Sequence, residues 1–213
     1  MNMNSGYFRK YRRATLAACL FAAQLCACGG KPAALPPLAA DARVLAFGDS
    51  LTAGTGASTE QAYPAQLALL VRREVINAGV PGETTAEGRA RLPAVLDESH
   101  PQLVILCEGG NDMLRRLDRG SMRENLAAMI REIQGRGIAV VLLAVPAPGL
   151  LRLRPDQTYS ELAKEFKLPL LEDKLSEILA DNQRKSDQIH PNAAGYRELA
   201  VAIAALLHGT GAV

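Results

Sequence analysis

The chain has 213 residues, of which 48% are hydrophobic, 22% are charged and 4% are aromatic, and it contains no Trp. This is the composition of one globular domain, and so few aromatic rings argue against a stacking platform for single-stranded nucleic acid. The formal net charge of +2 arises from four basic residues between Arg9 and Arg13, in a segment without acidic residues. The rest of the chain holds 20 basic and 22 acidic residues, so we expect no nucleic-acid partner.

Residues 1–27 have the pattern of an export signal. The basic stretch precedes an apolar run, Ala14 to Ala27, that is shorter than the about 20 residues needed to span a bilayer. The run ends in Leu25-Cys26-Ala27-Cys28, which resembles the lipobox of bacterial lipoproteins. This resemblance implies cleavage before Cys28 and acylation of that residue, which would anchor the protein in a membrane.

The residues around the predicted lipidation site bear on location and domain boundaries. Gly29, rather than Asp, follows Cys28, and by the same resemblance this implies the outer membrane, facing the periplasm of a bacterial cell envelope. A cleaved signal without lipid, which would give a soluble periplasmic protein, is the alternative. Residues 28–40 are then the lipidated cysteine and a flexible Pro-rich tether, and residues 41–213 are the folded domain. Cys107 is the single cysteine of that domain, so no intrachain disulfide is expected there.

From Asp41 onward, short apolar runs alternate with helical patterns. Three of these runs are continuously apolar, as expected of strands that are covered on both faces of a sheet. The alternation predicts an α/β fold, with a five-stranded parallel sheet between two layers of helices. The predicted strands are Arg43–Phe47, Glu74–Ile76, Gln102–Cys107, Ile138–Ala144 and Leu168–Leu171.

Helix starts are indicated by capping boxes, in which Ser or Thr precedes Glu by three residues. Such boxes occur at Thr84–Glu87, Ser121–Glu124 and Thr158–Glu161. A last helix is predicted from about Asn192 to Leu207. In sheets of this kind, functional groups gather in the loops at the carboxyl ends of the strands.

Polar residues of three such loops are candidates for acyl-transfer chemistry. Ser50 follows the first strand in Phe47-Gly-Asp-Ser50, near a helix start whose free N–H groups favour a developing negative charge. Gly79 follows the second strand and can offer a backbone N–H, and Asn111 follows the third, in Gly109-Gly-Asn-Asp112. Taken singly, each of these residues also fits an ordinary turn.

Asp187-Gln-Ile-His190 supplies the remaining groups before the last helix. A serine nucleophile needs a base, and the base needs a partner that fixes its tautomer. Pro191 disfavours helical geometry at His190, so the ring can project toward the edge of the sheet. When Asp187 and His190 are considered without the other blocks, they could also be a surface histidine and an aspartate of an ordinary turn.

The four blocks together resemble the SGNH, or GDSL, hydrolase family, in particular its bacterial thioesterase, lysophospholipase and arylesterase branch. The matching segments are Phe47–Gly54, Asn77–Thr85, Gly109–Asp112 and Asp187–Asn192. The resemblance implies a flavodoxin-like SGNH hydrolase fold and a catalytic triad of Ser50, His190 and Asp187. It also implies an oxyanion hole formed by the Ser50 and Gly79 N–H groups and the Asn111 amide. The branch commonly reads Glu-Leu before the third block, whereas this chain reads Cys107-Glu108.

The resemblance implies hydrolysis of a small acyl ester or lipid by a monomer, without a cofactor or metal. The expected substrates are lysophospholipid, fatty-acyl or aryl esters and thioesters, because membrane tethering would place the site near phospholipid and its lyso products. Pro146–Leu151 could wall an apolar acyl groove or form an ordinary Pro/Gly loop. The alternatives are a carbohydrate O-acetylesterase acting on cell-envelope glycan, and a scaffold module without activity. Cys107 is expected to be a buried strand residue rather than a second nucleophile.

Overall fold

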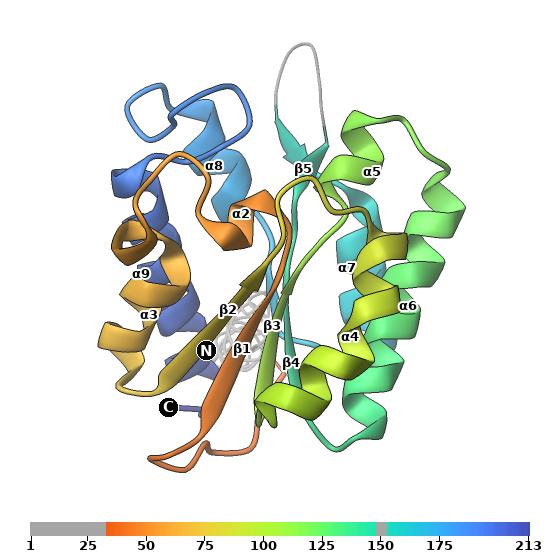
Figure 1. The fold of residues 1–213 in the computed structure, drawn as a ribbon, viewed down its shortest axis with the longest axis vertical. Helices are drawn as coiled ribbons and strands as arrows, with labels where there is room; N and C mark the ends of the chain where they lie inside the picture. The colour runs from red at the N-terminus through yellow and green to blue at the C-terminus, as the bar shows by residue number, and fades with distance from the viewer. Residues whose placement is uncertain (1–32, 148–152) are drawn as a thin grey trace, which may run out of the picture. The chain divides into compact units, whose positions relative to one another are not determined.

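The computed structural model describes residues 33–147 and 153–213 (Figure 1). Its main sheet is parallel and five-stranded, in the order β2-β1-β3-β4-β7. All five predicted strands are present, so the expected α/β architecture is confirmed. The strands are β1 (Arg43–Gly48), β2 (Glu74–Gly79), β3 (Leu103–Cys107), β4 (Ala139–Leu143) and β7 (Leu170–Leu171).

Helices cover both faces of the sheet, which produces the predicted three layers (Figure 1). α3 and α9 pack together on one face, and α4, α6 and α7 lie on the other. The α-helices are α2 (Ser50–Ala53), α3 (Tyr63–Val71), α4 (Thr85–Ser99), α5 (Gly110–Leu114), α6 (Arg119–Gly135), α7 (Gln157–Phe166), α8 (Lys174–Ala180) and α9 (Ala193–Thr210), and η1 (Thr59–Gln61) is a 3₁₀ turn.

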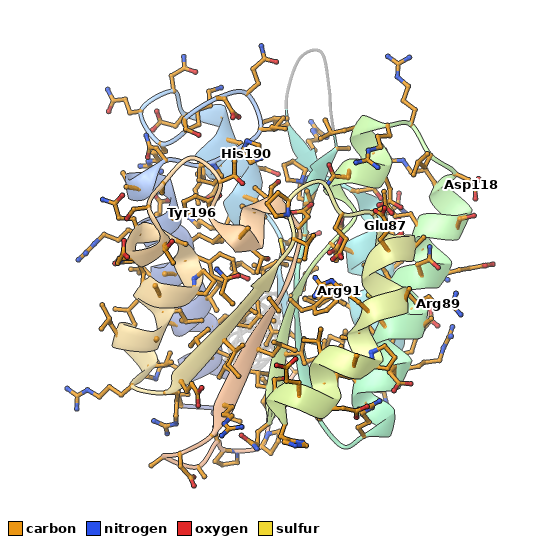
Figure 2. The ribbon with its side chains drawn as sticks, in the orientation of Figure 1. Glu87, Arg89, Arg91, Asp118, His190 and Tyr196 are labelled. Atoms are coloured by element: carbon orange, nitrogen blue, oxygen red, sulfur yellow. The ribbon has the colours of Figure 1, made fainter. Side chains whose placement is uncertain are left out.

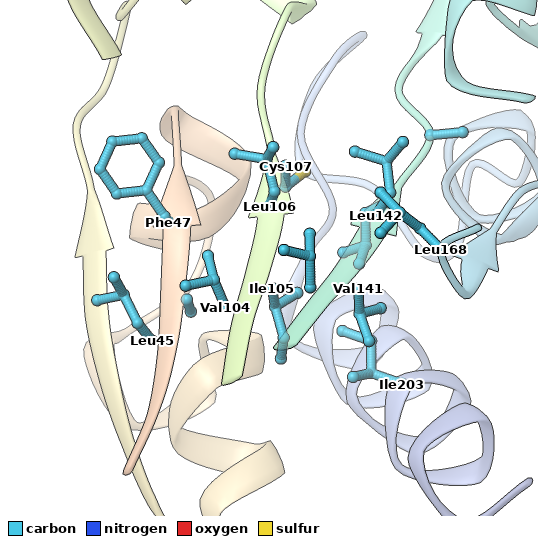
Figure 3. Close-up of a cluster of buried hydrophobic side chains, with 14 of the residues drawn as sticks. Leu45, Phe47, Val104, Ile105, Leu106, Cys107, Val141, Leu142, Leu168 and Ile203 are labelled. Carbon is cyan, nitrogen blue, oxygen red and sulfur yellow. The ribbon is translucent and has the colours of Figure 1, made fainter. Parts of the chain in front are cut away.

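The central strands explain why the sheet forms the core. β3 is buried along its whole length, and β1 and β4 are buried except at their first residues, as expected of strands that are covered by helices on both faces. Figure 3 shows apolar side chains of these strands in one cluster with Ile203 of α9. The register aligns Gly48 of β1 with Gly79 of β2 and with Cys107 of β3. The carboxyl ends of three neighbouring strands therefore lie at one edge, and their loops meet there.

One predicted capping box is confirmed, at the start of α4. The Thr84 side chain accepts a hydrogen bond from the Glu87 N–H, and the Glu87 carboxylate accepts one from the Thr84 N–H. The last helix also begins as predicted, because the Asn192 side chain caps it by accepting from the Gly195 N–H. That helix ends at Thr210, three residues later than expected.

The other two predicted helix starts are wrong. α6 begins at Arg119, where Asp118 is the N-cap and accepts from the Ser121 N–H. α7 begins at Gln157, where Asp156 is the N-cap and accepts from the Thr158 N–H. In both cases an aspartate two or three residues earlier takes the capping position, because its charged carboxylate is a stronger acceptor than a hydroxyl.

The described part of the predicted tether is bound to the domain rather than free. The Leu35 N–H donates to the Thr210 carbonyl at 3.1 Å, and the Leu38 N–H donates to the Ala212 carbonyl at 2.8 Å. Both leucine side chains are partly buried against the core. The chain is therefore attached to the end of α9 from Leu35 onward. The predicted signal peptide and Cys28 lie outside the described residues.

A short antiparallel pair that the sequence did not predict follows β4. It consists of β5 (Pro146–Ala147) and β6 (Arg154–Pro155), beside the loops at the carboxyl edge of the sheet (Figure 1). The expected apolar groove wall, Pro146–Leu151, is thus described only in its first two residues. Within residues 33–147 and 153–213, no helix has the length and apolar character needed to cross a bilayer.

Candidate active site

Ser50 lies where β1 turns into α2, at the carboxyl edge of the sheet. The preceding residue, Asp49, fixes this turn because its Oδ1 accepts a hydrogen bond from the Leu51 N–H at 2.9 Å. Ser50 is half-buried, and its N–H donates no hydrogen bond to the described residues. The hydroxyl and a free backbone N–H are therefore presented on the same side of a helix start.

Asp187 and His190 meet Ser50 from the loop before α9. Asp187 Oδ1 accepts hydrogen bonds from the N–H groups of Ile189 and His190, at 2.8 and 2.9 Å. Asp187 Oδ2 lies 2.8 Å from His190 Nδ1, and His190 Nε2 lies 2.9 Å from Ser50 Oγ. Figure 2 shows His190 beside α2 at the loop end of the sheet. The three side chains form one continuous line of hydrogen bonds.

The charge of Asp187 is stabilised by the same contacts. Partial burial by itself raises the pKa of its carboxyl, but hydrogen bonds from the His190 ring and from the N–H groups of Ile189 and His190 outweigh it and lower the pKa. A carboxylate at this place holds a proton on Nδ1 of the imidazole, so Nε2 is left as the acceptor toward Ser50. The arrangement can therefore take a proton from the serine hydroxyl.

Asn111 reaches the site from the start of α5. Its Nδ2 donates to the carbonyl of Glu83 at 2.9 Å and makes a longer contact, 3.3 Å, to Asp49 Oδ2. The longer contact to Asp49 uses the second N–H of the amide. A negatively charged substrate oxygen can take the place of Asp49 Oδ2 as the acceptor of that N–H. Asn111 lines the same pocket as Ser50 and His190. It is thus placed as a side-chain donor for a substrate oxygen.

Gly79 does not have the free N–H that the sequence led us to expect. Its N–H donates to the Asn77 side chain at 3.0 Å. Its Cα lies so close to α2 that an added Cβ would be 2.1 Å from the Ala53 nitrogen. The prediction of Gly79 as an oxyanion donor is therefore wrong for this structure. The glycine is required here because β2 and α2 approach each other closely.

Gly82 is the residue that sequence reasoning missed in the same block. It has a left-handed φ of 81°, and its N–H has no hydrogen-bond partner among the described residues. The next residue, Glu83, is the one whose carbonyl binds Asn111. The Gly82 N–H is therefore the free backbone donor nearest to Asn111 in this loop. The sequence does show a second glycine in this block, five residues after Asn77. Only the backbone conformation, however, shows that Gly82 and not Gly79 has the free N–H.

Two buried aspartates, Asp49 and Asp112, hold these loops. Burial raises the pKa of the Asp49 carboxyl to about 7, the Leu51 N–H and the charge of His190 oppose the rise, and the nearby carboxylates Glu83 and Asp112 add to it. Asp112 accepts hydrogen bonds from both the N–H and the hydroxyl of Thr85, at 2.8 and 2.6 Å. These carboxyls connect the loops after three strands.

Cys107 is the buried strand residue that we expected. It is fully buried at the end of β3, and burial raises the pKa of its thiol well above the ordinary value. A thiol in this state is a poor nucleophile. Within the described part of the chain, no group of three or more His, Cys, Asp or Glu side chains is arranged to hold a metal ion.

A pocket of about 260 Å³ opens beside Ser50 and His190. Its polar end is formed by Ser50, His190 and Asn111, together with Asp49 and Gln188. The remaining walls are mainly apolar. They come from α2, α5 and α8, from the β5–β6 pair and the residues next to it, and from the loop before α9. The apolar lining residues are Leu51, Leu114, Val145, Pro146, Leu153, Leu179 and Ile189.

Comparison with known proteins assigns the chain to a family. The model of the GDSL-like lipase/acylhydrolase family matches residues 46–198, a span that contains Ser50, Asn111, Asp187 and His190. The chain belongs to this family. It is a carboxylic ester hydrolase, and the resemblance inferred from the four sequence blocks is confirmed.

Relatives within the GDSL-like family agree with the match. The chain is 34% identical over 156 residues to the thioesterase 1/protease 1/lysophospholipase L1 of Escherichia coli K12, across 70% of this chain and 75% of that protein. It is 33% identical to an arylesterase of Vibrio mimicus, across 71% and 81% of the two chains. The crystal structure of TesA superposes with a TM-score of 0.71 at 30% identity, covering 79% of this chain and 99% of that one.

Proposed function

We propose that the protein is a serine esterase that acts through Ser50, His190 and Asp187. The observation that carries the proposal is the line of contacts from Asp187 Oδ2 to His190 Nδ1, at 2.8 Å, and from His190 Nε2 to Ser50 Oγ, at 2.9 Å. Both distances are within the reach that proton transfer requires. The residues come from loops that are far apart in the sequence and converge at one edge of the sheet.

In the first half-reaction the Ser50 oxygen attacks the acyl carbonyl carbon while His190 Nε2 accepts the hydroxyl proton. The carbonyl oxygen becomes an oxyanion, which the Ser50 and Gly82 N–H groups and the Asn111 amide stabilise. His190 then gives the proton to the leaving oxygen or sulfur as the bond to the carbonyl carbon breaks. The product is an acyl-enzyme on Ser50, and the alcohol or thiol departs.

In the second half-reaction water attacks the acyl-enzyme carbonyl carbon. His190 accepts a proton from this water, and the same three donors stabilise the second oxyanion. The bond to the Ser50 oxygen then breaks, the serine recovers its proton from His190, and the carboxylic acid is released. Asp187 stays ionised throughout, because its role is to orient the imidazole and stabilise its charged form.

The pocket supports acyl esters with an apolar chain as the substrates. Seven apolar residues line the space next to Ser50, and its volume lies just below the ~300–1,000 Å³ usual for small-molecule sites. We therefore propose fatty-acyl, aryl or lysophospholipid esters and thioesters, with chains of short to medium length in the pocket itself. A carbohydrate O-acetylesterase is the second candidate, since an acetyl group would also fit.

A chain-length panel of p-nitrophenyl esters on the domain from Ala33 onward separates these candidates. The apolar walls predict that kcat/KM rises from acetate to butyrate and hexanoate, with Ser50→Ala as the inactive control. Activity confined to acetate would favour the O-acetylesterase. Equal hydrolysis by Ser50→Ala would contradict the proposed mechanism.

We also propose that the protein is anchored to the bacterial cell envelope through an acylated Cys28, facing the periplasm from the outer membrane. The support is the sequence Leu25-Cys26-Ala27-Cys28 alone. Labelling cells with a radioactive or clickable fatty acid tests it, because the wild type should carry the label and Cys28→Ala should not. Recovery of an unlabelled wild type in the soluble periplasmic fraction would favour the cleaved signal without lipid.

A further inference from the structure

Glu108 is a buried acid without an evident partner, between β3 and the loop that carries Asn111. Its side chain is fully buried, and among the described residues its Oε2 accepts only from the adjacent Gly109 N–H, at 3.3 Å. Its Oε1 has no hydrogen-bond donor among the described residues. An ionised carboxylate needs several donors when it is removed from water, and Glu108 has one long contact. The surroundings therefore favour the protonated acid.

The neighbour of this acid, Glu83, is paired with an arginine. Glu83 accepts from Arg91 Nε and Nη2, at 2.5 and 2.6 Å, and the guanidinium is stacked on the Phe47 ring. A Cβ added at Gly88 would lie 3.2 Å from Glu83 Oε1 and 3.4 Å from Glu108 Oε1, so both oxygens face the same point. Figure 2 shows Arg91 on the side of α4 that faces the sheet. The positive charge of Arg91 thus neutralises Glu83. Arg91 makes no hydrogen bond with Glu108 among the described residues, so it does not neutralise a charge there.

We propose that Glu108 is a positioning residue, whose protonated carboxyl donates a hydrogen bond to the Glu83 carboxylate and thereby joins the two loops that carry the oxyanion donors. Glu83 follows Gly82 directly, and its carbonyl holds the Asn111 amide at 2.9 Å. Glu108 precedes the Gly109-Gly110-Asn111 turn. The inference rests on the proposed oxyanion hole, since it explains how the Gly82 N–H and the Asn111 amide keep their spacing.

The electrostatic surroundings agree with a neutral Glu108. Burial raises the pKa of this carboxyl well above the ordinary value, and Asp49 and the hydrogen bond with Glu83 raise it further, against the single Gly109 N–H. The other ionisable groups nearby are Cys107, whose thiol is buried and uncharged, and Tyr159, whose hydroxyl donates to the Glu108 carbonyl at 2.6 Å.

Removing this proton has a defined consequence. When Glu108 ionises at alkaline pH, two carboxylates face each other in a buried site, and the loops that they connect are pushed apart. The oxyanion donors then lose their spacing, so kcat falls. Apart from Leu114 of α5, the apolar pocket walls belong to other elements, so KM changes little. At neutral pH the hydrogen bond is intact, and no loss is expected.

The test compares Glu108→Gln with the wild type and with Glu98→Gln, a change at an exposed glutamate far along α4. Glutamine keeps the shape and a donor toward Glu83 but cannot ionise. We expect kcat of the wild type and Glu98→Gln for a p-nitrophenyl ester to fall at least about fivefold from its neutral-pH value as the pH is made alkaline. Glu108→Gln should keep its neutral-pH kcat within about twofold and lose this alkaline fall, with KM unchanged.

An infrared measurement decides the protonation state independently of activity. At about pH 8, where Asp49 is largely ionised, the wild type should retain the C=O stretching band of a protonated carboxylic acid, and Glu108→Gln should lack it. Identical alkaline profiles of wild type and Glu108→Gln would overturn the proposal. So would the absence of a protonated-acid band in the wild type, even if the variant fails to fold. Lack of any esterase activity in the wild type would instead refute the proposed function.

Discussion

Replacement of Asp49 by Asn should change how stability depends on pH. Asp49 is 2% exposed, and burial is the main reason why the pKa of its carboxyl is raised from 3.8 to about 7. Between these values the folded protein keeps a proton that the unfolded chain has released, so the free energy of unfolding falls as the pH rises. A tenfold change in the acid dissociation constant corresponds to about 1.4 kcal/mol, so the rise in pKa from 3.8 to about 7 amounts to about 4 kcal/mol.

Urea unfolding measured by circular dichroism from about pH 4 to about pH 8 gives this quantity directly. The free energy of unfolding of the wild type, relative to Asp49→Asn, should fall by about 4 kcal/mol across this pH range and then level off. Any loss of stability caused by the substitution that does not depend on pH is the same at every pH, so it does not affect this change with pH. Asp41→Asn, at an exposed position, is the control and should parallel the wild type. A constant difference between wild type and Asp49→Asn would refute the reasoning.

Three further substitutions test the site and its scaffold. Asn111→Ala should lower kcat by about 10²–10³-fold with little change in KM, since the amide stabilises an oxyanion that exists only during reaction. Asp187→Asn should lower kcat by about 10⁴-fold without unfolding the protein, because the imidazole is then held in the wrong tautomer, and circular dichroism checks the fold. Gly79→Ala should destabilise the protein by more than about 3 kcal/mol, because the new methyl meets the Ala53 backbone, whereas Gly135→Ala, with open space around it, should cost nothing.

The fold was largely predictable because the strands can be recognised from their apolar residues in the sequence. The first, third and fourth strands are apolar without interruption, which in a chain of this length points to a sheet covered on both faces. The spacing of Asp187 and His190 was equally informative, since three residues suffice for a turn in which one carboxylate binds both the backbone and the ring. Local sequence determines these features.

The helix caps and the free backbone N–H groups could not be predicted from sequence patterns, because neighbouring residues compete for the same hydrogen bonds. Ser121 matches the capping pattern, but Asp118 is present nearby and takes the capping role. Gly79 and Gly82 lie in one block, and only the Asn77 hydrogen bond and the left-handed φ of Gly82 show which N–H is free. A sequence pattern contains neither a dihedral angle nor the outcome of a competition between two acceptors.

Contacts between residues that are far apart in the sequence could not be predicted from short sequence patterns either. Leu35 and Leu38 looked like part of a tether because Pro and Ala dominate their surroundings. Their partners, the carbonyls of Thr210 and Ala212, lie at the opposite end of the chain. Glu108 was visible as an unusual residue before the Gly-Gly turn, yet its place beside the Glu83 carboxylate became evident only in three dimensions.

The proposed nucleophile can be identified directly by covalent trapping. The purified domain is treated with a fluorophosphonate, which phosphonylates an activated serine, and the labelled peptide is found by mass spectrometry. We expect one label per chain, on the peptide that contains Ser50, with no label on Ser50→Ala and strongly reduced labelling of His190→Ala. Stoichiometric labelling of another residue, or undiminished ester hydrolysis by Ser50→Ala, would contradict the account.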